Sequence, residues 1–193
     1  DRLWTATNQL TTVRWVGVQT VDTRLSNPIK DYPVQIKASA FGTGLPSRDL
    51  FVSPDHAIFV DGMLISASAL VNGRTIFQVD AMPLPGFRYF HVMTDAHEVL
   101  LAEALPVESY IDYVDDRPFE NSEERPKTPM AEMEFPRVSA KRQVPVRLRK
   151  LLEERAAKKG IVYISDWLKH AGTGLSFKGI HHPASREDVD LQE

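Results

Sequence analysis

The Asp61-Gly62 dipeptide constrains the fold most, because it stands between two short apolar runs. The first run covers residues 57–60 and the second covers residues 63–65. An Asp-Gly step between such runs is a strong signal for a two-residue β-hairpin. We therefore expect an antiparallel hairpin within residues 45–71, with the other segments arranged around it.

The residues directly before this hairpin are suited to chemistry. Ser53, Pro54 and Asp55 precede His56. Proline has no backbone N–H and pushes the residue before it towards an extended conformation. We therefore expect Ser53 and His56 to project from a stiff turn and not from a helix. Such a turn can hold a hydroxyl and an imidazole close together.

Further strands are expected on both sides of the hairpin. Alternation of apolar and polar residues predicts a half-buried strand over residues 11–23 and another over residues 34–41. The Asn72-Gly73 dipeptide predicts a tight turn, followed by a strand over residues 75–79.

Two more strands are expected before the composition changes. They cover residues 87–93 and 99–105, around a turn at residues 94–97, and Pro106 is expected to end the second strand. Short strands joined by Gly, Pro and Asn turns are typical of all-β proteins. The first part of the chain, up to about Tyr113, is therefore predicted to be mainly β.

The sequence suggests three parts: a β domain over residues 1–120, a linker or arm over residues 121–138, and a helical C-terminal extension over residues 139–193. The linker is rich in proline and charged residues, which favour extended structure. The extension contains one convincing helix, from Ser139 to Lys159, with a proline suited to its first turn. Its apolar stripe consists of Leu148, Leu151 and Leu152.

The expected helix between Ser139 and Lys159 is also basic. The side chains outside its apolar stripe include Arg147, Arg149, Lys150, Arg155, Lys158 and Lys159. These basic side chains are explained by a helix face that is exposed to solvent. The alternative is a binding site for an acidic protein partner or a nucleic acid. Because the whole chain has a formal net charge of −3, its composition favours no nucleic-acid partner.

Composition excludes several other classes. No apolar run approaches the roughly 18 residues of a membrane-spanning helix, so no membrane span is expected. The sequence has no cysteine, which rules out a disulfide framework, a cysteine-ligated zinc site and a cysteine nucleophile within these residues, but leaves the compartment open. The Gly42-Thr43-Gly44 run lacks the lysine and the helix of a phosphate loop. No Gly-x-Ser-x-Gly elbow of a serine hydrolase is present.

Three stretches together resemble the bacterial Hint domains of the Hedgehog/intein superfamily. They are VRWVG from Val13, LPSRDLFVSPDHAIFVDGMLISASALVNG from Leu45, and HVMTDAHEVLLAEALPVESY from His91. The resemblance covers residues 1–121 and implies a horseshoe-like β fold, to which the helical extension is added. It also implies self-processing: a Cys, Ser or Thr at the first position of the domain attacks the preceding carbonyl. The peptide bond becomes a (thio)ester that a nucleophile can open.

The resemblance also suggests roles for particular residues. Ser53 and His56 match a Thr-x-x-His element, in which the imidazole donates a proton to the departing amide nitrogen and the hydroxyl helps to fix the strained bond. Asp95 and His97 lie where the superfamily places further catalytic groups, and His91 lies on the same side. For each histidine, a purely structural hydrogen-bonding role is the alternative.

Two departures from the family pattern affect the expected activity. The chain begins at Asp1, after the family's nucleophile segment, so we expect it to come from a longer bacterial protein, exported or at the cell surface, with the cytoplasm as the alternative. Where inteins end in His-Asn, this sequence has Glu108-Ser109, so full splicing is not expected. The activity that we expect instead is cleavage of the upstream segment, or its transfer to another nucleophile. The upstream polypeptide would then be the substrate.

Two other functions stay open. The same fold could serve as a non-catalytic binding or structural module. His56, His91 and His97 could also ligate a metal, but they contain no short ligand pair such as His-x-His or His-x-x-x-His. We therefore expect neither a metal nor a cofactor.

Overall fold

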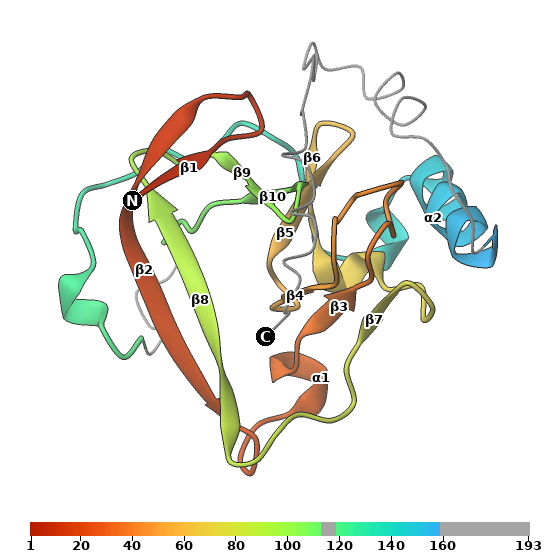
Figure 1. Ribbon diagram of the computed structural model, residues 1–193, viewed down its shortest axis with the longest axis horizontal. Coiled ribbons are helices and arrows are strands. Elements are labelled where there is room, and N and C mark those ends of the chain that lie inside the picture. Colours follow the sequence, from red (N-terminus) through yellow and green to blue (C-terminus); the bar gives the residue numbers. More distant parts are fainter. Residues whose placement is uncertain (113–118, 159–193) are drawn as a thin grey trace, which may run out of the picture.

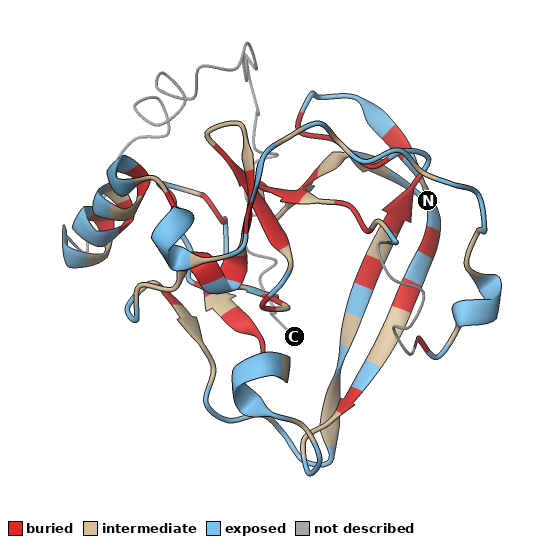
Figure 2. Cartoon of the chain, turned by 180° about the vertical axis from the view of Figure 1, so that it is seen from behind, coloured by how far each residue is buried: buried red, intermediate tan, exposed pale blue. Residues whose placement is uncertain are grey.

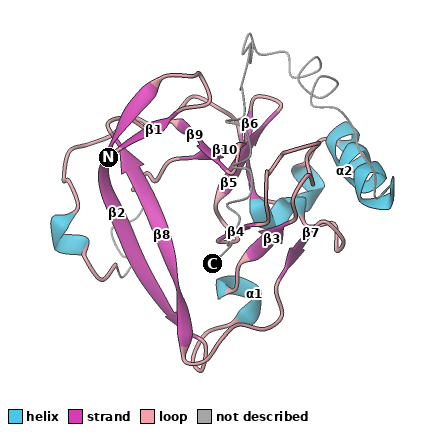
Figure 3. Cartoon of the chain, viewed as in Figure 1, coloured by secondary structure: helices cyan, strands magenta, loops and turns pink. Residues whose placement is uncertain are grey.

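The computed structural model describes residues 1–112 and 119–158, and most of the regular structure in these residues is β (Figure 3). The strands are β1 Arg2–Trp4, β2 Leu10–Asp22, β3 Val34–Ile36, β4 Leu50–Val52, β5 Ala57–Val60, β6 Met63–Ser66, β7 Ile76–Gln78, β8 Gly86–Thr94, β9 Val99–Ala102, β10 Leu105–Glu108 and β11 Arg137–Val138. The α-helices are α1 Pro28–Asp31 and α2 Val146–Lys158, and short 3-10 helices cover Ala67–Leu70 (η1), Ser122–Glu124 (η2) and Lys141–Gln143 (η3).

These strands form three sheets. Their orders are β1-β2-β8, β11-β6-β5-β10-β9 and β4-β3-β7. The long antiparallel pair of β2 and β8 stands along one side of the molecule, and α2 lies at the other side, beyond β6 and β7 (Figure 1). The mainly β fold class predicted from the sequence is therefore confirmed. None of the helices described here is long and apolar enough to cross a membrane.

The central hairpin forms as predicted. β5 and β6 pair antiparallel, with Val60 opposite Met63 at the turn. Asp61 and Gly62 both have positive φ, 50° and 73°. Glycine reaches this region without strain and aspartate tolerates it better than most residues, which is why this dipeptide favours the tight turn.

The strand predicted over residues 34–41 is shorter than expected. β3 ends at Ile36, and the Asp49 carboxylate accepts a hydrogen bond from the Ala38 N–H at 2.7 Å. Ser39 then adopts a φ of 62°. A side chain that binds the backbone competes with the strand ladder, so the alternating pattern continues in sequence after the strand has ended.

The strand predicted over residues 99–105 is interrupted by a turn that the sequence did not indicate. Glu103 and Ala104 have φ values of 51° and 65°, and they connect β9 to β10. Pro106 does not end a strand but lies inside β10, opposite Leu101. β10 pairs with β5 at Val107 alone. The missing N–H of Pro106 is therefore not needed for the hydrogen bonds between β10 and β5.

The main core lies between the five-stranded sheet, the β3 sheet and α2, and buried residues gather in the central strands (Figure 2). Leu148 and Leu152 of α2 are almost fully buried in it. Arg155 was expected on the solvated basic face, but it is buried and its guanidinium donates a hydrogen bond to the carbonyl of Phe41. The rest of the predicted extension, residues 159–193, lies outside the described residues.

Candidate functional site

The turn that carries Ser53 and His56 is held by backbone hydrogen bonds. The His56 N–H donates to the Ser53 carbonyl at 3.1 Å, which closes the turn. The 3-10 helix η1 fixes it from the other side, because Ala67 N–H donates to the His56 carbonyl at 2.9 Å and Ser68 N–H to the Pro54 carbonyl at 3.0 Å. The predicted stiff turn before the hairpin is confirmed.

An open cavity of about 300 Å³ lies beside this turn. Ser53 and His56 line it from the turn, His91 from β8, Glu108 from the end of β10, and Arg137 from β11. Three of the five residues predicted from the sequence thus face one space. Segments that are far apart in the sequence enclose this space, because the five-stranded sheet brings β5, β6, β10 and β11 together.

His91 is buried in an aromatic environment. It lies opposite Gly17 of β2, and its ring packs edge-on against Phe119 and Tyr110, with ring centroids 5.2 and 5.6 Å away. Edge-to-face packing at these separations is favourable for aromatic rings. His91 therefore forms part of the wall of the cavity and is positioned by packing.

Asp95 and His97 do not line the cavity. Asp95 lies at the β8–β9 turn with its side chain 55% exposed, and it forms an ion pair with Arg14 at 3.3 Å. The His97 side chain is fully buried, and its Nε2 lies 3.5 Å from Oε2 of Glu108. His97 thus reaches the cavity only through Glu108.

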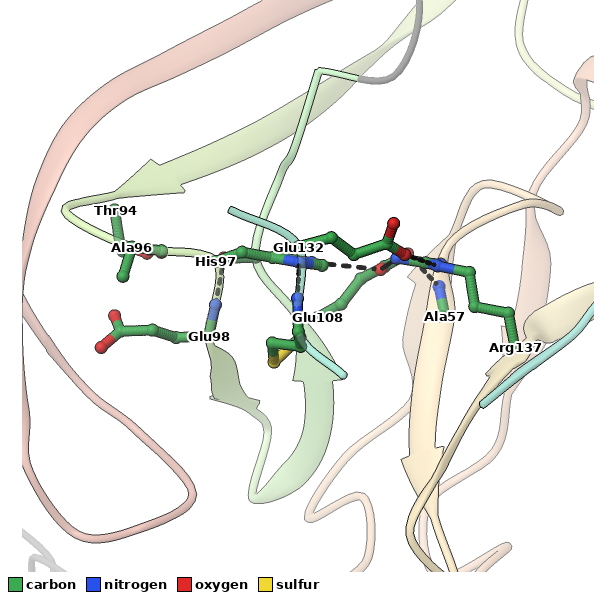
Figure 4. Close-up of polar contacts among 10 residues, drawn as sticks. Ala57, Thr94, Ala96, His97, Glu98, Glu108, Glu132 and Arg137 are labelled. Carbon is green, nitrogen blue, oxygen red and sulfur yellow. Dashed lines mark hydrogen bonds and ion pairs between the residues drawn. The ribbon is translucent and has the colours of Figure 1, made fainter. Parts of the chain in front are cut away.

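Glu108 is the centre of a polar network (Figure 4). Its Oε1 accepts a hydrogen bond from the Ala57 N–H at 3.0 Å, and its Oε2 lies 2.7 Å from Nη2 of Arg137. Burial alone raises the pKa of Glu108. The close approach of the His97 imidazole, the hydrogen bond from Arg137, and the positive charges of Arg137 and His56 more than offset this effect and hold the pKa at about 2. The carboxylate is therefore charged at neutral pH.

Glu108 and Arg137 were not among the site residues predicted from the sequence. Glu108 stands where inteins have a histidine, and Arg137 lies in the charged stretch expected to be a linker or an arm. No local pattern marks either residue. Their roles arise because β11 pairs in parallel with β6, which brings Arg137 beside β10.

The structure also bears on the histidine metal site considered from the sequence. In residues 1–112 and 119–158, no group of three or more His, Asp or Glu side chains is arranged to hold a metal ion. His97 instead accepts a hydrogen bond on Nδ1 from the Met133 N–H at 3.1 Å. His97 therefore does not join His56 and His91, which line the cavity.

Comparison with known proteins gives one finding. The model of a family described as the Hint domain matches residues 1–114 of this chain. Neither the comparison with curated proteins nor that with solved structures gave a match. The matched residues include Ser53, His56, His91 and Glu108, whereas Arg137 lies beyond them.

Proposed function

This chain belongs to the Hint domain family, and from that premise we propose that it processes its own polypeptide by an N-to-S or N-to-O acyl shift that releases or transfers the upstream segment. The observation that carries the proposal is the shared cavity: Ser53 and His56 line it from a turn fixed by backbone hydrogen bonds. A hydroxyl and an imidazole held in one open space are the groups that such a rearrangement needs.

The proposed reaction begins with a Cys, Ser or Thr upstream of Asp1. Its sulfur or oxygen bonds to the preceding carbonyl carbon, the C–N bond breaks, and His56 gives a proton to the departing amide nitrogen. The proton that the thiol or hydroxyl loses returns to the imidazole, so the net transfer is from the nucleophile to the nitrogen. The products are a (thio)ester and a free amine. Water or another nucleophile then attacks the ester carbonyl, releasing the upstream segment and regenerating the thiol or hydroxyl. In this scheme Ser53 helps to hold the peptide bond before it breaks.

Full splicing is not part of the proposal. Ser109 has no side-chain amide, so it cannot cyclise as the terminal asparagine of an intein does. Its hydroxyl accepts a hydrogen bond from the Glu98 N–H at 2.9 Å, and its own N–H donates to the Glu98 carbonyl at 2.8 Å. Ser109 thus joins two segments of the fold, which supports a structural role for it.

The test is to express the protein together with the residues that precede Asp1 in its natural parent, and to follow fragments by intact mass. We expect His56→Ala to slow cleavage by about a hundredfold or more, because general acid catalysis typically contributes that much. Lys30→Ala, on α1 at the far end of the β2–β8 pair, is the control and should cleave normally (Figure 1).

Two outcomes would contradict the proposal. Cleavage at an unchanged rate in folded His56→Ala would remove His56 from the reaction. A wild-type parent that stays uncut under reducing, thiol-rich conditions would favour a non-catalytic module on the same fold.

A further inference from the structure

The segment before and within β11 is built into the wall of the cavity. β11 pairs in parallel with β6, with Arg137 opposite Leu64 and Val138 opposite Ile65. The Leu64 N–H also donates to the Pro136 carbonyl at 2.9 Å. Phe135 packs against Phe59 of β5, with ring centroids 4.7 Å apart. This segment lies outside residues 1–114, the part matched by the family model.

Arg137 links two carboxylates across this junction. Its Nη2 lies 2.7 Å from Oε2 of Glu108, and its Nε donates to Oε1 of Glu132 at 2.7 Å. The Glu108 side chain is only 12% exposed, whereas that of Arg137 is 34% exposed. A planar guanidinium with two fixed carboxylate partners has little freedom to rotate. Arg137 therefore holds the buried Glu108 carboxylate in one orientation.

Glu108 transmits that orientation to the residue next to His56. Its other oxygen accepts the hydrogen bond from the Ala57 N–H, at the first position of β5 (Figure 4). The negative charge of Glu108 also interacts favourably with a positive charge on His56. Glu108 thus fixes the start of the strand that follows His56.

A second contact from the same segment orders His97. A backbone N–H can only donate, so Nδ1 of His97 must accept the hydrogen bond from Met133, and the neutral ring then carries its proton on Nε2. That nitrogen faces Oε2 of Glu108 at 3.5 Å. Met133 and Arg137 therefore act on the same carboxylate, one through His97 and the other directly.

We propose that Arg137 is a positioning residue of the self-processing site, which acts through Glu108 to hold His56 in place. The inference rests on the function proposed above. It makes the segment from Glu132 to Val138 a working part of the site, although this segment lies beyond the residues that the family model matches.

The first test measures cleavage of the same parent protein with substitutions at Arg137. Arg137→Gln keeps a hydrogen-bond donor but removes the charge, and we expect cleavage to slow by about tenfold to a hundredfold, as for a misplaced catalytic group. Arg137→Lys restores the charge but not the planar contact with two carboxylates, and should recover only part of the rate. Arg48→Gln breaks a comparable arginine–glutamate pair, with Glu103, outside the cavity and should have no effect. Wild-type cleavage rates in folded Arg137→Gln would overturn the inference.

The second test needs no cleavage, and therefore separates the inference from the proposed function. It follows the Glu108 carboxyl carbon, the Ala57 amide and the His56 ring by NMR in the 193-residue chain. In the wild type, the Ala57 amide should titrate together with Glu108, because the two are hydrogen-bonded at 3.0 Å. Arg137→Gln should raise the titration midpoint of Glu108 and shift the His56 ring signals, whereas Arg48→Gln should leave both unchanged.

The two tests together separate the possible failures. If the wild-type parent does not cleave, the proposed function fails, and the NMR result alone then decides whether Arg137 positions His56. If the Glu108 and His56 signals do not respond to Arg137→Gln, the positioning role is overturned, whatever the cleavage result. If Arg137→Gln does not fold, Arg137→Lys and Glu132→Gln replace it. The inference is contradicted if the Ala57 amide signal stays at its wild-type position in both of these variants.

Discussion

Glu108 shows how a buried charge can be stabilised by its immediate partners. A carboxylate taken out of water loses hydration, and this loss favours its neutral form. Here the Ala57 N–H, the His97 imidazole and the Arg137 guanidinium all lie around it. Removing one partner of such a network should lower the free energy of unfolding by more than the intact pair contributes to it, because the other partner is left buried and unsatisfied.

The low pKa of Glu108 predicts how stability depends on pH. Its folded-state pKa of about 2 lies below the ordinary value of 4.5, so its contribution is fully present above pH 4.5 and is lost as the pH falls to 2. That contribution is on the order of 3 kcal/mol at pH 7. We expect Glu108→Gln to destabilise the protein at pH 7, and the difference from wild type to shrink steadily towards pH 2. Urea unfolding at several pH values measures it.

A control and a contrary outcome belong to this experiment. Glu103→Gln also removes an arginine-bound carboxylate, but its partner Arg48 has a side chain that is 79% exposed, so solvent screens the pair. Its effect should be small at every pH. A stability difference for Glu108→Gln that does not change with pH would contradict the assignment of a charged, buried Glu108.

At the scale of the element, β2 depends on a glycine beside a large aromatic ring. The Trp15 ring lies over Gly17, two residues further along the same face of the strand, and packs against Phe119 at a centroid distance of 5.0 Å. Its Nε1–H donates to the Asn121 carbonyl at 3.2 Å. The absence of a side chain at Gly17 therefore allows the segment after the family-matched region to dock on β2.

Gly17→Ala should disrupt this docking. A Cβ at this position would lie 2.6 Å from Cζ3 of Trp15 and 3.0 Å from Cδ1 of Phe119, which is closer than carbon atoms approach. We expect a destabilisation of about 1–3 kcal/mol, the usual cost of overpacking, with a red shift of tryptophan emission as Trp15 moves towards water. Urea unfolding and fluorescence measure the two effects.

The exposed neighbour provides the control for this substitution. Val16→Ala changes a side chain on the opposite face of β2, where it contacts solvent, and should change neither the stability nor the emission appreciably. Wild-type stability and emission in Gly17→Ala would mean that the methyl group is accommodated without disturbing Trp15, and would contradict the prediction.

At the scale of the whole molecule, the core crosses the end of the family match. The main core cluster contains residues from both sides of residue 114, and those that follow it are Val138, Val144, Leu148 and Leu152. Arg155 adds a hydrogen bond to the Phe41 carbonyl. Hence the Hint-matched part does not bury its apolar surface by itself in this structure.

A fragment of residues 1–118 should therefore fold poorly. Each of the buried apolar side chains that it lacks contributes about 2 kcal/mol, and together they approach the 5–15 kcal/mol by which a typical protein is stable. We expect broad unfolding and exposed apolar surface, measured by circular dichroism and dye binding. The matched control is residues 1–158, which keeps α2 and should unfold cooperatively. Equal unfolding midpoints for the two fragments would contradict a shared core.

Local patterns in the sequence were sufficient for several features. The Asp61-Gly62 hairpin and the turn from Ser53 to His56 depend on residues close together in the chain, and both are present in the structure. The mainly β class follows for the same reason, since alternation and turn residues act over a few positions. The juxtaposition of Ser53 and His56 in one cavity is a consequence of that local turn.

The tertiary structure alone decided which distant residues meet. It brought His91 to the cavity, left Asp95 at the surface, and placed His97 behind Glu108. It also placed Arg137, from the charged stretch expected to be a linker or an arm, in a short strand against β6. The catalytic roles of His56, Ser53, His91, Asp95 and His97 stay predictions. Register and sheet order depend on long-range packing, which the spacing of residues along one chain does not encode locally, whereas turns and hairpins depend on neighbouring residues and can be recognised from the sequence.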